Sequence, residues 1–271
     1  MFDKFIGFIG AGNMGSAMIG GILNASLATT GQMIASDHFA ATLEQIRTKF
    51  SIETTPSNET VAERSDILFL AVKPNMYDEV IPQIASHIKP NCIVVSIAAG
   101  KTIASVEAAF GKDIKLVRAM PNTPALVGEA MSALCANSFV TSDELADIQT
   151  IFNSFGKCEV VPESMIDAVV GVSGSSPAYV YMFIEAMADA AVADGMPRAQ
   201  AYKFAAQSVY GAAKMVLETG KHPGELKDAV CSPGGTTIEA VAALEKGGLR
   251  DTVITAQRVC VKKSHDMSSG K

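Results

Sequence analysis

Six residues near the N-terminus, Gly10-Ala11-Gly12-Asn13-Met14-Gly15, carry the spacing G-x-G-x-x-G. This spacing is typical of a turn that binds the pyrophosphate of a dinucleotide. Gly10 allows the tight turn, Gly12 lets the backbone approach the phosphates, and Gly15 lets the following helix pack against the strand. A glycine-rich turn that only packs tightly is the alternative. The strand predicted before the motif and the helix predicted after it favour the dinucleotide, with its phosphates at the helix N-terminus.

The adenosine ribose of such a dinucleotide would lie at the end of the second predicted strand, where Ser36 and Asp37 stand. A carboxylate at this position accepts a hydrogen bond from the 2′-hydroxyl of NADH and repels the 2′-phosphate of NADPH. No arginine follows at once to favour NADPH, so Asp37 by itself indicates NADH. A role for Asp37 as a helix N-cap or a solvated loop carboxylate stays open.

Two further loops follow predicted parallel strands, at the edge where such sheets bind ligands. They are Ala71-Val72-Lys73-Pro74 and Ala98-Ala99-Gly100. Lys73 is placed to donate to a ribose hydroxyl, unless it is only a solvated lysine in a turn. Asn58, in the loop before the strand predicted at 67–72, is open in the same way because asparagine also caps helices.

Two glycine-rich stretches each precede a predicted helix in the C-terminal half. They are Gly171-Val172-Ser173-Gly174-Ser175-Ser176-Pro177 and Cys231-Ser232-Pro233-Gly234-Gly235-Thr236-Thr237. Backbone N–H groups and hydroxyls at a helix N-terminus bind a carboxylate as well as a phosphate. Two well-capped helices would need no ligand, but beside a nicotinamide cofactor we favour a substrate that carries a carboxylate. Asn122, between Pro121 and Pro124, is held in a stiff turn that could present it to a cleft between the two halves of the chain.

The residues that are scarce narrow the chemistry further. The chain has four histidines, none beside an obvious partner carboxylate, so a histidine-driven hydroxyacid dehydrogenase is poorly supported. An imine reductase needs less, because a protonated imine already accepts hydride. The five cysteines are odd in number and form no C-x-x-C pair, which argues against a disulfide framework and a zinc site. We expect no metal, and cysteines that are small buried residues in a reducing compartment.

Charge and hydropathy exclude several classes of protein. The chain of 271 residues carries 28 acidic and 22 basic residues, and this net charge of −6 offers no basic field for nucleic acid or an anionic membrane. The uncharged N-terminal segment 5–23 is compatible with a signal peptide, but its six glycines suit a turn better. A second uncharged segment, 168–184, is broken by polar residues and falls short of the roughly 20 apolar residues of a membrane span. We expect a soluble protein of the cytoplasm.

The elements that must position these residues alternate along the first 160 positions. Short runs rich in Ile, Val, Leu and Phe predict strands at 4–9, 32–36, 67–72, 92–97 and 115–120. Stretches with helical spacing, such as 13–25 and 40–50, separate them. This alternation indicates βαβ units and hence an α/β, doubly wound, mostly parallel sheet of the Rossmann type. Two more runs, 132–136 and 158–161, flank a helix that begins after Thr141 or Ser142 and could extend the sheet.

After Pro162 the pattern changes, because no good strand occurs and apolar residues repeat at intervals of three and four. We therefore predict a dinucleotide-binding domain at 1–161 and an all-helical domain at 162–271. Helices are predicted at 177–194, 197–220, 224–230, 236–246 and 249–267. No low-complexity linker separates the two domains, so we expect them to pack closely and share a cleft.

Taken together, six motifs resemble the pyrroline-5-carboxylate reductase family over essentially the whole chain. They are FIGAGNMG (8–15), AVKP (71–74), SIAAG (96–100), RAMPNTPALVG (118–128), VVGVSGSSPAYV (169–180) and CSPGGTTIEAV (231–241). The resemblance implies reduction of a cyclic imine carboxylate, L-1-pyrroline-5-carboxylate, to L-proline, the last step of proline synthesis. It also implies that the helical domain forms an intertwined dimer with the active site at the dimer interface, often assembled further into rings such as a decamer.

The resemblance also assigns residues. It implies cofactor contacts from Gly10 to Gly15, Ser36, Asp37, Asn58, Ala71 to Pro74 and Ala98 to Gly100. It implies substrate contacts from Glu163, Ser232, Gly234, Gly235, Thr236 and Thr237, with the Thr237 hydroxyl beside the ring nitrogen as the catalytic group. The family usually prefers NADPH, with NADH as the second cofactor, which opposes the argument from Asp37. Ser36 and neighbouring backbone would then hold the 2′-phosphate.

Two other classes of function remain open at this point. A β-hydroxyacid dehydrogenase or a deazaflavin-dependent reductase shares the fingerprint and would act on hydroxyacids or with another hydride donor. A nucleotide-binding sensor would bind the cofactor and show no turnover with any imine.

Overall fold

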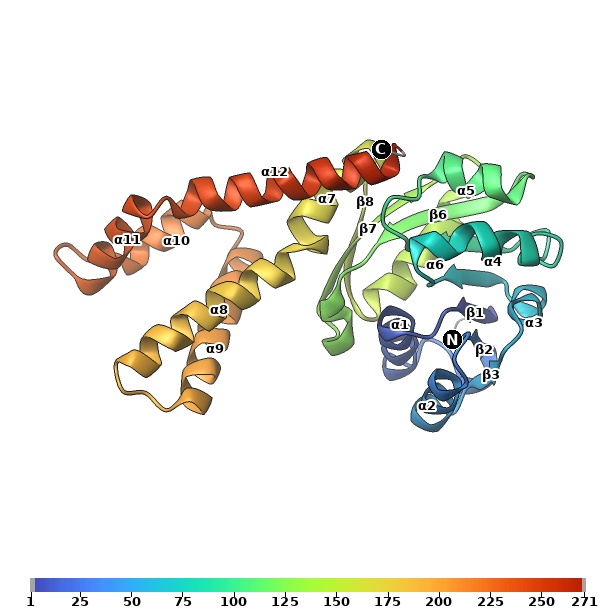
Figure 1. Ribbon diagram of the computed structural model, residues 1–271, viewed down its shortest axis with the longest axis horizontal. Helices are drawn as coiled ribbons and strands as arrows, with labels where there is room; N and C mark the ends of the chain where they lie inside the picture. Colours follow the sequence, from blue (N-terminus) through green and yellow to red (C-terminus); the bar gives the residue numbers. More distant parts are fainter. Residues whose placement is uncertain (1–2, 270–271) are drawn as a thin grey trace. The chain divides into compact units, whose positions relative to one another are not determined.

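A computed structural model describes residues 3–269 of the chain, which form two compact units. The first unit comprises residues 3–175 and 260–269, and the second comprises residues 176–259. The strands of the first unit are β1 (Ile6–Ile9), β2 (Met33–Ser36), β3 (Glu53–Thr55), β4 (Ile67–Leu70), β5 (Ile93–Ser96), β6 (Lys115–Met120), β7 (Ala130–Ala136) and β8 (Gly156–Val160). Its helices up to residue 169 are α1 (Asn13–Asn24), α2 (Ala40–Phe50), α3 (Asn58–Arg64), α4 (Tyr77–Ile84), α5 (Ile103–Phe110), α6 (Ser142–Asn153) and α7 (Ile166–Val169) (Figure 1).

The strands form one eight-stranded sheet in the order β3-β2-β1-β4-β5-β6-β7-β8. All neighbouring pairs are parallel except β6 and β7, so the predicted doubly wound, mostly parallel sheet is confirmed. The two runs predicted to extend the sheet form β7 and β8. Strand order reverses between β1 and β4, and the last residues of β1, β2 and β4 are in register, Ile9 with Ser36 and with Leu70. Their carboxyl ends therefore meet at one edge, where such folds bind ligands.

Helices cover both faces of the sheet, and its central strands are therefore buried on both sides. Every residue of β1, β2, β4 and β5 is buried. One face packs against α1 and α6, with Phe8 and Phe69 stacked at 4.7 Å between ring centroids. The opposite face packs against α3, α4 and α5. Continuous apolar runs, rather than alternating ones, are what a sheet covered on both faces requires.

The edge strand β3 was not among the predicted strands. Its sequence, Glu53-Thr54-Thr55, contains no apolar residue, and all three residues are exposed or half-buried. β3 pairs with β2 through backbone hydrogen bonds at the edge of the sheet, and such a strand leaves no hydrophobic pattern in the sequence.

The two compact units divide at a different place from the predicted domain boundary at 161/162. Residues up to 175 belong to the first unit because Ile166 is fully buried against Met120 and Ala133 of the sheet. The chain returns to this unit at Cys260, and the Ser264 hydroxyl donates to Asp167 Oδ1 at 2.6 Å. The change to a helical pattern at Pro162 therefore precedes the boundary between the compact units.

The second unit is all helical, as predicted. It contains α8 (Ser176–Ala193), α9 (Arg198–Thr219), α10 (Pro223–Val230), α11 (Thr236–Lys246) and the first part of α12 (Leu249–Ser268). The observed bounds agree with the predicted ones to within one residue. Within residues 3–269, no helix is long and apolar enough to cross a lipid bilayer.

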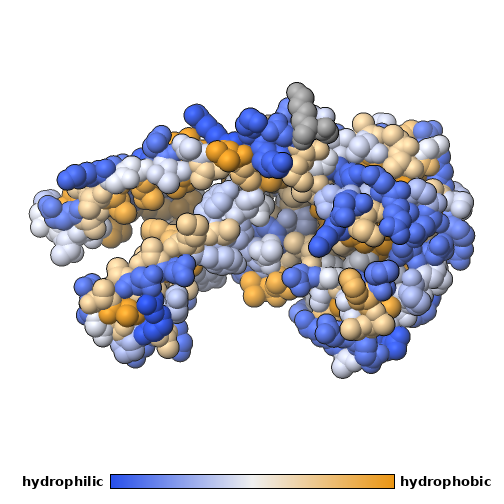
Figure 2. Space-filling model, viewed as in Figure 1, coloured by the Kyte–Doolittle hydropathy of each residue, from blue (hydrophilic) through white to orange (hydrophobic). Residues whose placement is uncertain are grey.

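The second unit lacks a core of its own within one chain. Of its residues 176–259, only Ala188, Ala201 and Ala205 are buried. Large apolar side chains of α8, such as Tyr181 and Met182, are 60% and 70% exposed. Figure 2 shows apolar side chains over the surface of this helix. Helices that are apolar around most of their circumference need a partner to cover them.

Candidate active site

The fingerprint turn lies at the switch point of the sheet, between the ends of β1, β2 and β4. The Gly10 N–H donates to the Ser36 carbonyl at 2.9 Å, and the Ala71 N–H donates to the Ile9 carbonyl at 2.8 Å. Gly10 has φ +97°, and a Cβ there would lie 2.6 Å from the Ala71 carbonyl oxygen. Only glycine fits this crossing of two backbones, as the motif predicts.

Two other glycines of the motif shape the space around it. A Cβ on Gly15 would lie 2.4 Å from the Gly10 carbonyl oxygen, so glycine is needed for the helix to pack on the turn. A Cβ on Gly12, in contrast, would meet nothing within 4 Å. Gly12 is the N-cap of α1, and its carbonyl accepts from the Ser16 N–H at 2.8 Å. The open side of Gly12, at a helix N-terminus, fits a pyrophosphate.

The predicted ribose residues meet at the end of β2. Ser36 Oγ donates to Asn58 Oδ1 at 2.8 Å, and Asn58 Nδ2 donates to Gln83 Oε1 at 3.0 Å. Asn58 does not cap a helix: it is the first residue of α3, whose N-cap is Ser57. Both helices concerned, α3 and α4, pack on the same face of the sheet, which is why residues so far apart in sequence meet.

Asp37 is held by backbone groups on both sides. Its Oδ2 accepts from the Ala11 N–H at 2.9 Å and its Oδ1 accepts from the Phe39 N–H at 3.0 Å. Asp37 thus holds the fingerprint turn and also lies at the position predicted for the ribose. Of the residues that directly follow it, 38–41, only His38 can carry a positive charge.

The two other loops predicted to bind the cofactor follow β4 and β5 and are joined by Tyr77, which sequence reasoning did not single out. Its hydroxyl donates to the Leu70 carbonyl at 2.9 Å and lies 3.0 Å from Ser96 Oγ. Leu70 and Ser96 are the last residues of their strands. Burial raises the pKa of Tyr77 to about 12, so the phenol stays protonated at physiological pH. Lys73 is exposed and stands directly before the 3-10 turn Pro74–Met76.

Glu163 forms an ion pair with the buried Arg118, and sequence reasoning missed this pair. Its Oε1 accepts from Arg118 Nη1 at 2.8 Å and from the Ile103 N–H at 2.8 Å. Arg118 is 3% exposed and lies on β6. Burial, with a smaller effect of Glu163, raises the pKa of the neighbouring Cys135 to about 11. These two hydrogen bonds join Glu163 to β6 and to the first residue of α5.

Asn122 and the stretch 171–177 differ from the sequence-based predictions. Asn122 is buried, donating to the Ser173 carbonyl at 2.9 Å and accepting from the Met131 N–H at 3.0 Å.

Residues Val170–Gly174 form a π-helical turn that leads from α7 into α8, and the Ser175 N–H donates to the Val170 carbonyl. The chain thus reaches the start of α8 through a π-helical turn and a bend at Ser175, and an anion site at 171–177 stays a prediction.

The second predicted anion site, residues 231–237, does lie at a helix N-terminus. α11 begins at Thr236, its N-cap is Gly235, and no side chain caps it. Gly234 has φ +67°, and a Cβ there would meet nothing within 4 Å. Thr237 is half-buried in the first turn, so helix capping does not account for its hydroxyl. These residues and Ser232 lie in the second unit, whereas the predicted cofactor residues and Glu163 lie in the first.

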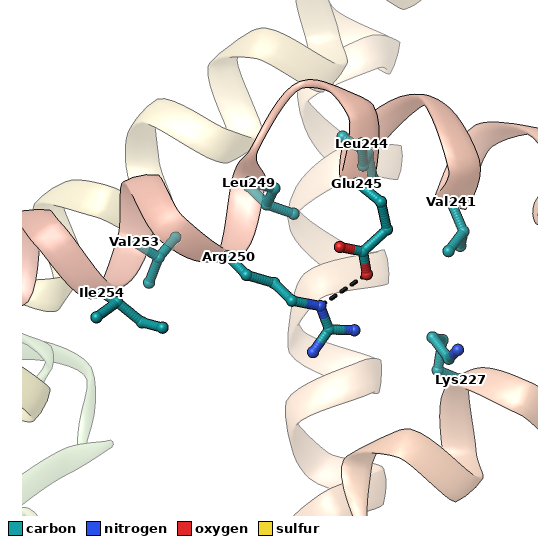
Figure 3. A pocket seen from close by; sticks show the side chains of 8 residues that line it. All are labelled: Lys227, Val241, Leu244, Glu245, Leu249, Arg250, Val253 and Ile254. Atoms are coloured by element: carbon teal, nitrogen blue, oxygen red, sulfur yellow. Dashed lines mark hydrogen bonds and ion pairs between the residues drawn. The ribbon is translucent and has the colours of Figure 1, made fainter.

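An apolar pocket lies one turn further along α11. It is lined by Val241 and Leu244 of α11, by Leu249, Val253 and Ile254 of α12, and by Lys227, Glu245 and Arg250 (Figure 3). The only ion pair drawn across it joins Arg250 Nε to Glu245 Oε1 at 2.7 Å. Like the exposed apolar side chains of α8, this apolar lining is left uncovered in a single chain.

All five cysteines are free thiols, and three of them, Cys92, Cys135 and Cys158, are buried. Cys231 and Cys260 are half-buried. Residues 3–269 hold no cluster of three or more His, Cys, Asp or Glu side chains able to bind a metal ion.

Comparison with known families matches both halves of the chain. Residues 163–267 match the family model described as pyrroline-5-carboxylate reductase dimerisation. Residues 5–100 match the model described as NADP oxidoreductase, coenzyme F420-dependent.

Known proteins match the chain over nearly its full length. The pyrroline-5-carboxylate reductase of Escherichia coli (strain K12) is 53% identical over 266 residues, which cover 98% of this chain and 99% of that protein. The enzyme of that name from Methanosarcina acetivorans is 44% identical over 94% of this chain and 95% of its own length. A crystal structure of Plasmodium falciparum pyrroline carboxylate reductase with NADP bound has a TM-score of 0.90 and 33% identity, covering 99% of each chain. The chain belongs to the pyrroline-5-carboxylate reductase family.

Proposed function

We propose that this chain reduces L-1-pyrroline-5-carboxylate to L-proline with a reduced nicotinamide cofactor, as the last step of proline synthesis. The observation that carries the proposal is the dinucleotide turn at the switch point of the sheet, with Gly12 open, in a chain 53% identical to a named reductase of this kind. A nicotinamide cofactor, when bound, supplies the hydride.

We assign the cofactor to the carboxyl edge of the sheet. Gly10 to Gly15 would hold the pyrophosphate, Ser36, Asp37 and Asn58 the adenosine ribose, and the loops Ala71–Pro74 and Ala98–Gly100 the nicotinamide half. We propose NADPH as the preferred cofactor and NADH as the second. The NADP in the Plasmodium relative supports this order. Asp37 limits the preference, because its charge lies where a 2′-phosphate would have to bind.

We assign the substrate carboxylate to the N-terminus of α11. Ser232, Gly234, Gly235 and Thr236 offer hydroxyls and backbone N–H groups beside the positive end of the helix dipole. The Thr237 hydroxyl holds the imine nitrogen and relays a proton to the product amine, so its main contribution is orientation. The substrate contact that the family resemblance implies for Glu163 stays a prediction; its Oε1 accepts from Arg118 and from Ile103, and its side chain is 35% exposed.

We propose that the helical unit forms a dimer, that the active site is completed at the dimer interface, and that dimers assemble into rings such as a decamer. The match to a dimerisation model and the three buried residues among 176–259 support the dimer. We also propose a cytoplasmic location, which the five free thiols support.

A steady-state assay tests the reaction. The purified chain should consume NADPH, and more slowly NADH, when L-1-pyrroline-5-carboxylate is added. A matched series with 3-hydroxyacids and the oxidised cofactors should give no turnover, and neither should a reduced deazaflavin donor with the imine. Cofactor binding without consumption of either cofactor would instead indicate a nucleotide-binding sensor and would overturn the proposal.

A further inference from the structure

The loop Ala98–Gly100 is held from behind by two segments of the chain. We call residues 163–175 the entry segment and residues 260–269 the exit segment, because they lead into and out of the second unit. Both segments belong to the first unit and both contact this loop or the start of the helix that follows it. The loop itself is assigned to the nicotinamide half of the cofactor under the proposed function.

The entry segment holds the far end of the loop through Glu163. Its carboxylate accepts from the N–H of Ile103, the first residue of α5, and this N–H has no partner within its own helix. The same oxygen accepts from Arg118, which lies on the strand next to β5 and pairs in register with Ser96. Ala99 packs against the cluster that contains the buried Ile166. The hydrogen bond from Ile103, just after the loop, and the packing of Ala99 within it therefore fix the loop to the entry segment.

The exit segment contacts the loop at Gly100. A Cβ on Gly100 would lie 3.2 Å from Met267 Cβ and 3.6 Å from Met267 Cε. Gly100 also has φ +77°, a conformation that other residues adopt only with strain. Met267 thus covers the one position of the loop that has no side chain.

The two segments are also bonded to each other. Ser264 Oγ donates to Asp167 Oδ1 at 2.6 Å, and the Cys260 thiol lies 3.1 Å from Ser175 Oγ. The loop therefore faces one joined surface, built from residues on either side of the helical unit in sequence.

We propose that Glu163 and Met267 are positioning residues that brace the loop Ala98–Gly100 for the cofactor. Glu163 acts through the amide of Ile103, and Met267 acts through its contact with Gly100. In this role neither residue needs to touch the substrate. This inference rests on the proposed function only for the identity of the ligand, and it assigns Glu163 a role different from the one that the family resemblance implies.

The test compares variants on opposite sides of the loop with neighbours that do not contact it. Glu163→Ala and Met267→Ala are measured against two control variants. Met165→Ala alters an exposed residue two positions after Glu163, and Lys262→Ala alters an exposed residue of the exit segment. The Kd for NADPH is measured by titration without substrate. KM for the imine and kcat are then measured at saturating NADPH.

Bracing predicts that Kd for NADPH rises about five- to tenfold in both Glu163→Ala and Met267→Ala, while KM for the imine changes by less than about twofold. The two control variants should leave both constants unchanged. A direct substrate contact predicts the reverse: a raised KM for the imine in Glu163→Ala, unchanged Kd for NADPH, and no effect of Met267→Ala. That pattern would overturn the inference.

Two features keep the test decisive. If Glu163→Ala does not fold, because it leaves Arg118 buried without its partner, Glu163→Gln keeps an acceptor oxygen for Ile103 and Met267→Ala carries the main comparison. An unchanged Kd for NADPH in Met267→Ala would also overturn the inference. Because Kd is measured without turnover, a chain that binds NADPH but reduces no imine refutes the proposed function and leaves the bracing inference to be judged on its own.

Discussion

Asp37 Oδ2 accepts the backbone N–H of Ala11 at 2.9 Å, which joins the end of β2 to the second residue of the fingerprint turn. The carboxylate therefore combines two roles at one position. It holds the turn that would bind the pyrophosphate, and it places a negative charge where the 2′-substituent of the ribose would lie. A substitution at Asp37 must be chosen so that these two roles separate.

Asp37→Asn separates them because it removes the charge and keeps an oxygen that can accept from Ala11. The ratio of kcat/KM for NADPH over that for NADH should rise about fivefold, the equivalent of about 1 kcal/mol of repulsion removed. Asp37→Ser, which also loses the bond to Ala11, should in addition weaken the binding of both cofactors. An unchanged ratio in Asp37→Asn would show that this carboxylate does not read the ribose.

Thr237→Ala should lower kcat/KM for the imine about 10–100-fold, the effect of one well-placed hydrogen bond worth about 1.5–3 kcal/mol. Cofactor affinity should stay nearly constant, and Thr237→Ser should restore most of the activity. The melting temperature should not change, because α11 is capped by Gly235 and by no side chain. A lowered melting temperature with intact kinetics would instead assign Thr237 a purely structural role.

The helical unit should be dimeric wherever the protein is active. Light scattering at assay concentration should give at least twice the chain mass of 28.4 kDa. Met182→Glu places a charge on an α8 side chain that is 70% exposed in one chain, and it should lower the mass or the melting temperature. Glu185→Gln, an exposed change on the same helix, should do neither. Full activity in a monomer would contradict this prediction.

Three thiols should resist modification in the native protein. Burial raises the pKa of Cys92 to about 12 and that of Cys158 to about 11, and burial together with Glu163 raises that of Cys135 to about 11. Thiolate, the reactive form, would appear at these sites only as the pH approaches 11. Peptide mapping after iodoacetamide treatment at pH 8 should find Cys92, Cys135 and Cys158 unmodified until denaturant is added. Rapid native labelling of any of the three would refute this prediction.

Much of the fold is predictable because its signals are local. Strands such as β1 and β4 are apolar throughout, and the glycine spacing between β1 and α1 reflects backbone approaches at Gly10 and Gly15 that no other residue permits. The N-terminus of α11 was predictable for the same reason, since Gly234 and Gly235 interrupt a helical pattern directly before it.

What the sequence did not reveal depends on contacts between distant residues. Glu163 meets Arg118 across 45 positions and Ile103 across 60, and nothing in the local sequence marks these pairs. Tyr77 looks like one more apolar residue on the buried face of α4, and only the sheet register brings Leu70 and Ser96 to its hydroxyl. The glycines at 171 and 174 suggested free backbone N–H groups before a helix, whereas Val170–Gly174 form a π-helical turn between α7 and α8.

Transfer of an isotopic label tests the proposed reaction most directly. The chain is given L-1-pyrroline-5-carboxylate and NADPH that carries deuterium at C4 of the nicotinamide, on the transferred face. The proline formed should carry one deuterium at C5, the former imine carbon, with one cofactor oxidised for each proline. Proline without the label, or cofactor oxidation without proline, would contradict hydride transfer to the imine carbon.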